Sequence, residues 1–61
     1  MVEKIYYIEN SFEMSMALGE IEETFPCFVD REYIEMNYSK VTIKARQEDI
    51  ASIEDILAPY M

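Results

Sequence analysis

The side chains of this 61-residue chain that could do chemistry are almost all carboxylates. There are 13 Asp and Glu, 5 Lys and Arg, one Cys and no His. Neighbouring acids occur in three pairs, which are Glu22-Glu23, Glu48-Asp49 and Glu54-Asp55. Neighbouring residues on a helix point about 100° apart, so the two members of a pair cannot converge on one metal ion or substrate. We therefore assign these acids to solvated helix surface.

The groups needed for catalysis are missing. Without His the chain lacks the commonest general base and the usual catalytic triads. Cys27 has no His to activate it, and we expect it to be a small buried hydrophobic residue. Gly19 is the only glycine, so no glycine-rich phosphate loop can form. The sequence predicts no enzyme activity, no cofactor and no metal site.

A binding surface is predicted on the stretch from Asn10 to Phe25, which has helical periodicity. Asn10 or Ser11 can cap this helix, and Pro26 ends it. Its buried stripe consists of Met14, Leu18, Ile21 and Phe25. Three residues without carboxylates (Phe12, Met16 and Gly19) fall on the opposite side of the helix. The acids that flank them are Glu13, Glu20 and Glu23.

An apolar centre inside a charged rim is typical of a protein interface, and a glycine permits close approach. The predicted protein-binding residues are therefore Phe12, Glu13, Met16, Gly19, Glu20 and Glu23. The alternative is that Phe12 folds back onto the core and that Met16 is an isolated exposed residue, which is common.

The net charge of −8 favours a basic protein surface as the partner, such as the groove of a nucleic-acid-binding enzyme. The same charge disfavours direct binding of nucleic acid or of anionic membranes. A small acidic inhibitor encoded by a phage or mobile element, acting as a DNA mimic on a host protein, fits this size and charge. Solubility alone is the competing explanation of the charge.

Two other functions compete with the protein-binding module. One is a homo-oligomeric structural or regulatory domain. The other is a weak nucleic-acid-binding sheet, whose exposed face would combine an aromatic with bases, namely Tyr33, Lys40, Lys44 and Arg46. The N-terminal MVEKIYYIEN has two acids and lacks the apolar run of a signal peptide, and no segment has the roughly 20 apolar residues of a membrane span. We expect a cytoplasmic protein.

Besides this helix, the sequence predicts one strand before it, two strands after it and a second helix. Val2 to Glu9 predicts a strand with two partly apolar faces, which is either covered on both sides or meets a partner on one. Apolar and polar residues alternate over residues 32–46, which predicts a β-hairpin. A two-residue turn at Tyr38-Ser39 would pair Met36 with Val41 and Ile34 with Ile43, while a longer loop over 37–40 is the alternative. Residues 47–59 predict the second helix.

Together these elements predict one α+β domain over residues 1–61, in the order β-α-β-β-α. A right-handed crossover places the first strand beside the third, with both helices on one face of a three-stranded sheet. This is a ferredoxin-like arrangement that lacks the last strand. The predicted core consists of Met14, Leu18, Ile21, Phe25, Ile34, Met36, Val41, Ile43, Ile50, Ile53 and Leu57.

The missing fourth strand would leave the first strand as an exposed edge at Ile5, Tyr6 and Tyr7. A chain this short is marginally stable alone, because it buries only about 60% of its unfolded surface. We therefore expect a homodimer that pairs through this edge.

Overall fold

The computed structural model describes all 61 residues and has three strands and two helices. In chain order these are β1 (Val2–Glu9), α1 (Phe12–Thr24), β2 (Cys27–Glu35), β3 (Tyr38–Ala45) and α2 (Ile50–Leu57). Short 3-10 turns at Gln47–Asp49 and Ala58–Tyr60 flank α2. The strands form one antiparallel sheet in the order β1-β3-β2. The predicted α+β fold and strand order are confirmed.

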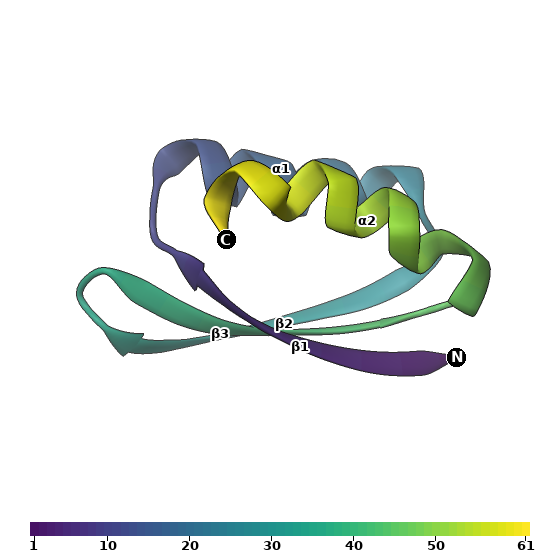
Figure 1. Cartoon of the computed structure of the whole chain (residues 1–61), viewed down its shortest axis with the longest axis horizontal. Coiled ribbons are helices and arrows are strands. Elements are labelled where there is room, and N and C mark those ends of the chain that lie inside the picture. The colour runs from purple at the N-terminus through teal and green to yellow at the C-terminus, as the bar shows by residue number, and fades with distance from the viewer.

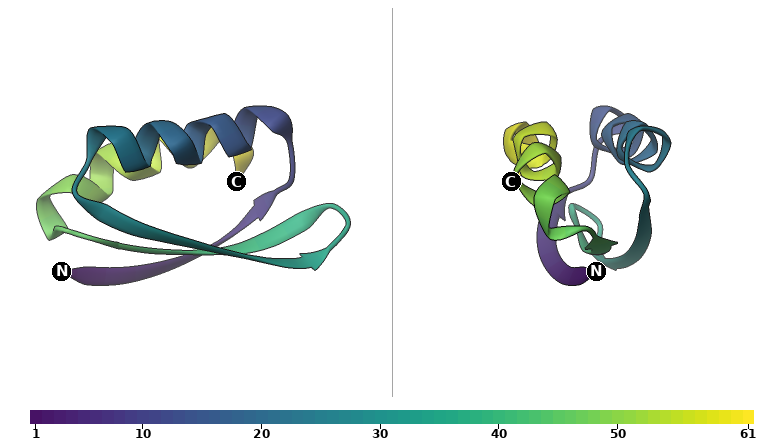
Figure 2. Two further views of the ribbon diagram at one scale, coloured as in Figure 1. Left: turned by 180° about the vertical axis from the view of Figure 1, so that it is seen from behind. Right: turned by 90° about the vertical axis from the view of Figure 1, so that its right-hand side faces the viewer.

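Both helices lie on the same face of the sheet and run antiparallel to each other (Figure 1). Seen end-on in Figure 2, α2 lies above the β1 side of the sheet and α1 above the β2 side. No element covers the other face of the sheet. No helix has the length and apolar character needed to cross a membrane.

Local chemistry sets the ends of α1. Ser11 is the N-cap, and its Oγ accepts a hydrogen bond from the backbone N–H of Met14 at 3.0 Å. Asn10 is therefore not the cap. The helix gives way to extended backbone at Phe25, where the following proline disfavours the α region.

The core lies between the two layers and contains ten buried residues. They are Ile8, Met14, Leu18, Ile21, Val41, Ile43, Ala45, Ile50, Ile53 and Leu57. Phe25 is partly buried against this cluster. Ile8 is fully buried, and Val2 and Tyr6 pack beside it, so one face of β1 meets the core.

The predicted hairpin register is wrong. Cα partners in the structure are Val29 with Ile43 and Arg31 with Val41, and the turn lies at Met36-Asn37. Ile34 sits at a β-bulge and Met36 is 91% exposed, so neither belongs to the core.

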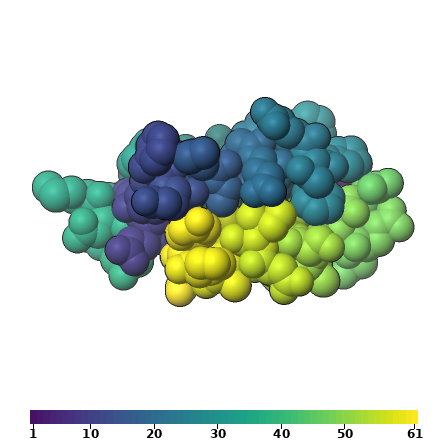
Figure 3. All heavy atoms as spheres, turned by 90° about the horizontal axis from the view of Figure 1, so that it is seen from above, coloured from purple at the N-terminus to yellow at the C-terminus, as the bar shows by residue number.

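The cause of this error is that β2 begins at Cys27, in the segment interpreted as a connection. Cys27 and Val29 alternate as well as Ile34 and Met36 do, so matching apolar with apolar residues could not distinguish the two registers. The observed register places Cys27 and Val29, the smaller of the two pairs, beneath the helices. The tip of the β2–β3 hairpin projects beyond the helices, as Figure 3 shows in teal.

Candidate functional site

A groove of about 840 Å³ runs between α1 and α2 on the side of the helices that faces away from the sheet. Figure 3 looks down on the two helices that border it. From α1 it is lined by Glu13, Met16, Ala17, Gly19, Glu20 and Glu23, and from the C-terminal segment by Ile56 and Tyr60. Five of the six residues predicted from the sequence line this groove.

The sixth predicted residue, Phe12, lies outside the groove at the first position of α1. Its side chain is 75% exposed, which excludes the alternative in which it folds onto the core. Met16 lies one turn further along the helix and is 61% exposed. The two apolar side chains therefore both face solvent.

Gly19 has no steric reason within the chain to be glycine. A Cβ built at this position meets no atom within 4 Å. Glycine inside a helix is less stable than alanine by roughly 0.5–1 kcal/mol. This position therefore costs stability while keeping the wall of the groove low.

The whole net charge of the protein lies in the helical layer, which we define as α1 together with residues 47–61. This layer holds eight of the 13 acids and none of the five bases, and the remaining five acids balance the five bases. The eight acids are Glu13, Glu20, Glu22, Glu23, Glu48, Asp49, Glu54 and Asp55. The three acids of the groove make no ion pair, since the ion pairs of the protein involve only Glu3, Glu48 and Asp49.

Helix stability does not explain this distribution. Glu22 and Glu23 lie in the last turn of α1, which contains no basic residue. The C-terminal end of a helix is the negative end of its dipole, where an acid is disfavoured by about 0.3–1 kcal/mol. Glu20 and Glu23 also repel each other at a spacing of three residues.

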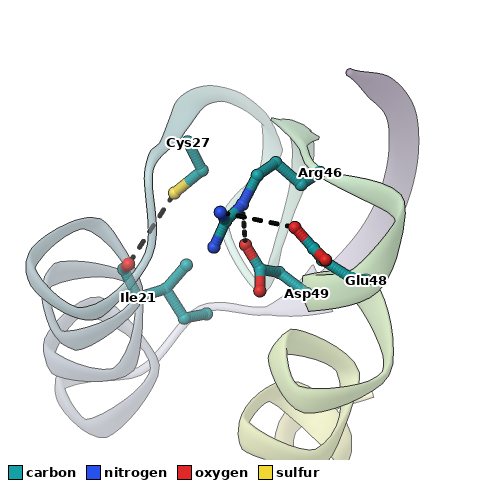
Figure 4. Close-up of polar contacts among 5 residues, drawn as sticks. All are labelled: Ile21, Cys27, Arg46, Glu48 and Asp49. Atoms are coloured by element: carbon teal, nitrogen blue, oxygen red, sulfur yellow. Dashed lines mark hydrogen bonds and ion pairs between the residues drawn. The ribbon is translucent and has the colours of Figure 1, made fainter.

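The only base that pairs with acids of the helical layer is Arg46, which lies near the C-terminal end of α1 and the start of α2 (Figure 4). Arg46 donates from Nε to Asp49 Oδ2 at 2.8 Å, and its Nη1 lies 3.3 Å from Glu48 Oε1. Nearby, the Cys27 thiol donates to the backbone oxygen of Ile21 at 3.7 Å. Burial raises the pKa of Cys27, and the charges of Glu22 and Asp49 raise it further. The thiol is therefore kept protonated and is not an activated nucleophile.

The basic sheet face expected from Tyr33, Lys40, Lys44 and Arg46 does not form. Tyr33 pairs with Ser39 on the side of the sheet that faces the helices, where the Arg31 guanidinium stacks on its ring at 4.5 Å. Arg46 is engaged by the acids described above. Only Lys40 and Lys44 remain on the open face.

The three predicted edge residues point in two directions. Tyr6 faces the helices, and its Oη donates to Glu54 Oε2 at 2.9 Å. Ile5 and Tyr7 are exposed on the open face. The backbone N–H of Asn10 donates to Asn37 O in the same register, so by alternation the N–H groups of Ile5 and Tyr7 point to the unpaired edge.

Sequence reasoning missed a polar cluster at the other end of the molecule. Asn10 Nδ2 donates to the backbone oxygen of Met36 at 3.1 Å, while Asn10 Oδ1 accepts from Arg31 Nη2 at 2.9 Å. Arg31 also donates to Ser15 Oγ and to Ser39 Oγ, and the buried Ser39 hydroxyl donates to Asn10. The only signal in the sequence was Ser39, a polar residue on the side of its strand that is otherwise apolar and buried.

Comparison of the chain with protein-family models, curated proteins and solved structures gives no match.

Proposed function

We propose that this protein is a binding module whose helical layer docks on a basic surface of another protein. The observation that carries the proposal is the coincidence of the full net charge of −8 and an apolar groove in one layer. Carboxylates that have no internal partner attract a basic surface at long range and steer its approach. The apolar floor then supplies the short-range contact that makes the complex persist.

Different residues of the groove provide the apolar contact and the charge. Met16, Ile56 and Tyr60 offer apolar surface, and Phe12 extends it beyond the end of the groove. Glu13 and Glu23 are ten residues apart, which corresponds to about 15 Å along the helix at 1.5 Å per residue. An occupant that spans this length with a few Lys or Arg side chains would meet all three rim acids.

The finer proposal is that the partner is a nucleic-acid-binding enzyme and that this protein inhibits it. A layer that bears only negative charge resembles a phosphate backbone to a basic groove. A protein encoded by a phage or mobile element would gain from blocking such a host enzyme. In that case nucleic acid and this protein compete for one site, and added DNA would release the protein from its partner.

The test has two stages. Affinity capture from a lysate at low and high salt recovers the partner, and surface plasmon resonance then measures both rates for matched variants. Glu20→Lys with Glu23→Lys should slow association and flatten its salt dependence, as rim charges do. Phe12→Ala and Met16→Ala should speed dissociation, each at a cost of about 1–3 kcal/mol.

The matched control is Glu32→Lys, which reverses one charge on the sheet. This variant should leave both rates nearly unchanged. Gly19→Ala adds a methyl group to the groove wall without a clash inside the protein and should weaken binding while the fold is kept. If the helical variants bind like the parent while the Glu32 variant does not, the groove is not the docking site.

A further inference from the structure

The outer edge of β1 is a second surface, separate from the groove, and its backbone groups have no partner. β3 is the only strand beside β1 in the sheet. The bond from Asn10 N–H to Asn37 O shows that even-numbered residues of this ladder bond to β3, so odd-numbered residues of β1 direct their N–H and C=O groups outward. β1 has eight residues without a proline or a β-bulge, so this edge is a template for a further strand.

The edge of β1 matches itself in one antiparallel register. Outward groups must meet outward groups, so odd-numbered residues face odd-numbered residues. With a two-fold axis at Ile5, this residue lies opposite its own copy, and Glu3 lies opposite Tyr7 while keeping its ion pair with Lys44 at 3.7 Å. An axis one residue further along would place Glu3 opposite Glu9, and like charges directly opposite each other are destabilising. The axis at Ile5 is therefore favoured.

The same register brings together a base and an acid that have no charged partner within one chain. Lys4 lies on the side of β1 that faces the helices, as Tyr6 does, and it makes no ion pair. Glu54 of α2 makes none either, and its Oε2 accepts the hydrogen bond from Tyr6 Oη at 2.9 Å. Lys4 of a second copy lies opposite Tyr6 in this register, where its ammonium can reach Glu54. The two-fold axis generates this ion pair twice.

The acids of the groove lie away from this edge. α1 lies above the β2 side of the sheet, and β2 is the strand farthest from the edge of β1 (Figure 2). At about 100° per residue, the side of α2 opposite the groove residue Ile56 bears Ala51, Glu54 and Ala58, so two small side chains flank the acid that Lys4 would pair. The net charge of −8 on each copy opposes association at long range, and physiological salt screens this repulsion beyond about 8 Å.

We infer that β1 binds β1 of a second copy of this chain, antiparallel and with the two-fold axis at Ile5. The two sheets then form one continuous sheet, and both helical layers lie on the same side of it. The dimer presents two acidic grooves on one face. This inference does not depend on what the grooves bind, because none of its contacts involves a residue of the groove.

Sedimentation equilibrium of the full chain tests the inference, first with a matched pair of proline variants. The parent should sediment as a species of twice 7.2 kDa. Ile5→Pro removes an outward N–H that β3 does not use, and it should weaken the dimer about tenfold or more. Tyr33→Pro removes an outward N–H at the opposite edge of the sheet, on β2, and should leave the dimer unchanged. Circular dichroism confirms that each variant is folded.

A second pair of variants tests the register through charge. Lys4→Glu places an acid beside Glu54 of the other copy and should weaken the dimer about tenfold or more. Lys40→Glu changes the net charge equally but lies on β3, and it should have a much smaller effect. Adding Glu54→Lys to Lys4→Glu exchanges the two charges and should restore the dimer. A double variant that associates no better than Lys4→Glu would overturn this register.

Amide hydrogen exchange separates strand pairing from any other mode of association. The N–H groups of Ile5 and Tyr7 face the free edge and bond only if another strand adds there. They should exchange slowly in the dimer and fast in dilute solution, where the chain is dissociated. A monomeric parent at millimolar concentration, a dimer unaffected by both Ile5→Pro and Lys4→Glu, or a dimer with unprotected Ile5 and Tyr7 amides would each overturn the inference.

Discussion

The helical layer and the sheet differ in charge far more than in apolar content. Each exposes large hydrophobic side chains, with Phe12 and Met16 on the helices and Ile5 and Phe28 on the sheet. The helical layer contains no base, however, while acids and bases balance in the rest of the chain. Exposed apolar surface alone therefore does not indicate which partner a face takes. In this protein the charge around that surface differs, because the helical layer carries acids alone while the open face of the sheet also carries Lys40 and Lys44.

The largest expected effect tests whether the two layers share one core. Leu18→Ala in α1 and Ile43→Ala in β3 should each lower the free energy of unfolding by about 2–5 kcal/mol. A loss of this size unfolds a domain whose total stability is about 5 kcal/mol. Met36→Ala is the control and should change stability by less than about 0.5 kcal/mol, because this side chain lies in solvent. Thermal denaturation measures all three, and a parent-like melt of either core variant would contradict the two-layer packing.

A smaller effect tests the contrast in charge directly. Glu23→Lys should stabilise the fold by about 0.3–1 kcal/mol, because it relieves repulsion within the helical layer and places a cation at the negative end of α1. Glu32→Lys on the sheet should give little change. Added salt should raise the melting temperature of the parent and should narrow the difference between the parent and Glu23→Lys. Equal salt responses of the two lysine variants would argue that the segregation of charge has no energetic effect.

The smallest effect concerns alkaline pH and the contacts between the layers. Burial and the hydrogen bond to Glu54 raise the pKa of Tyr6, and burial raises that of Cys27. Above about pH 9 the unfolded chain releases these protons while the folded chain retains them, so stability falls as pH rises. Tyr6→Phe should make this alkaline loss shallower in urea titrations at several pH values. An unchanged pH profile would show that Tyr6 does not couple the two layers.

The sequence was sufficient for the elements and their order because the periodicity of α1, α2 and β3 is strong. Its failure was the pairing of β2 with β3. Either Cys27 and Val29 or Ile34 and Met36 could face the apolar residues of β3. Only the position of the helices above the sheet decides which pair is buried. The α1 side of the groove was predictable because one helix carries it. Ile56 and Tyr60 were not, since they join the groove only through the packing of α2 beside α1.

Asn10 ties together parts of the chain that are far apart in sequence. Its backbone N–H donates to Asn37 O, and its side chain donates to the backbone oxygens of Glu35 and Met36. The hairpin turn therefore obtains these hydrogen bonds only after the β1–α1 connection has docked on it. We therefore expect the projecting tip, which would fray as an isolated hairpin, to open and close together with the start of α1 as one cooperative unit.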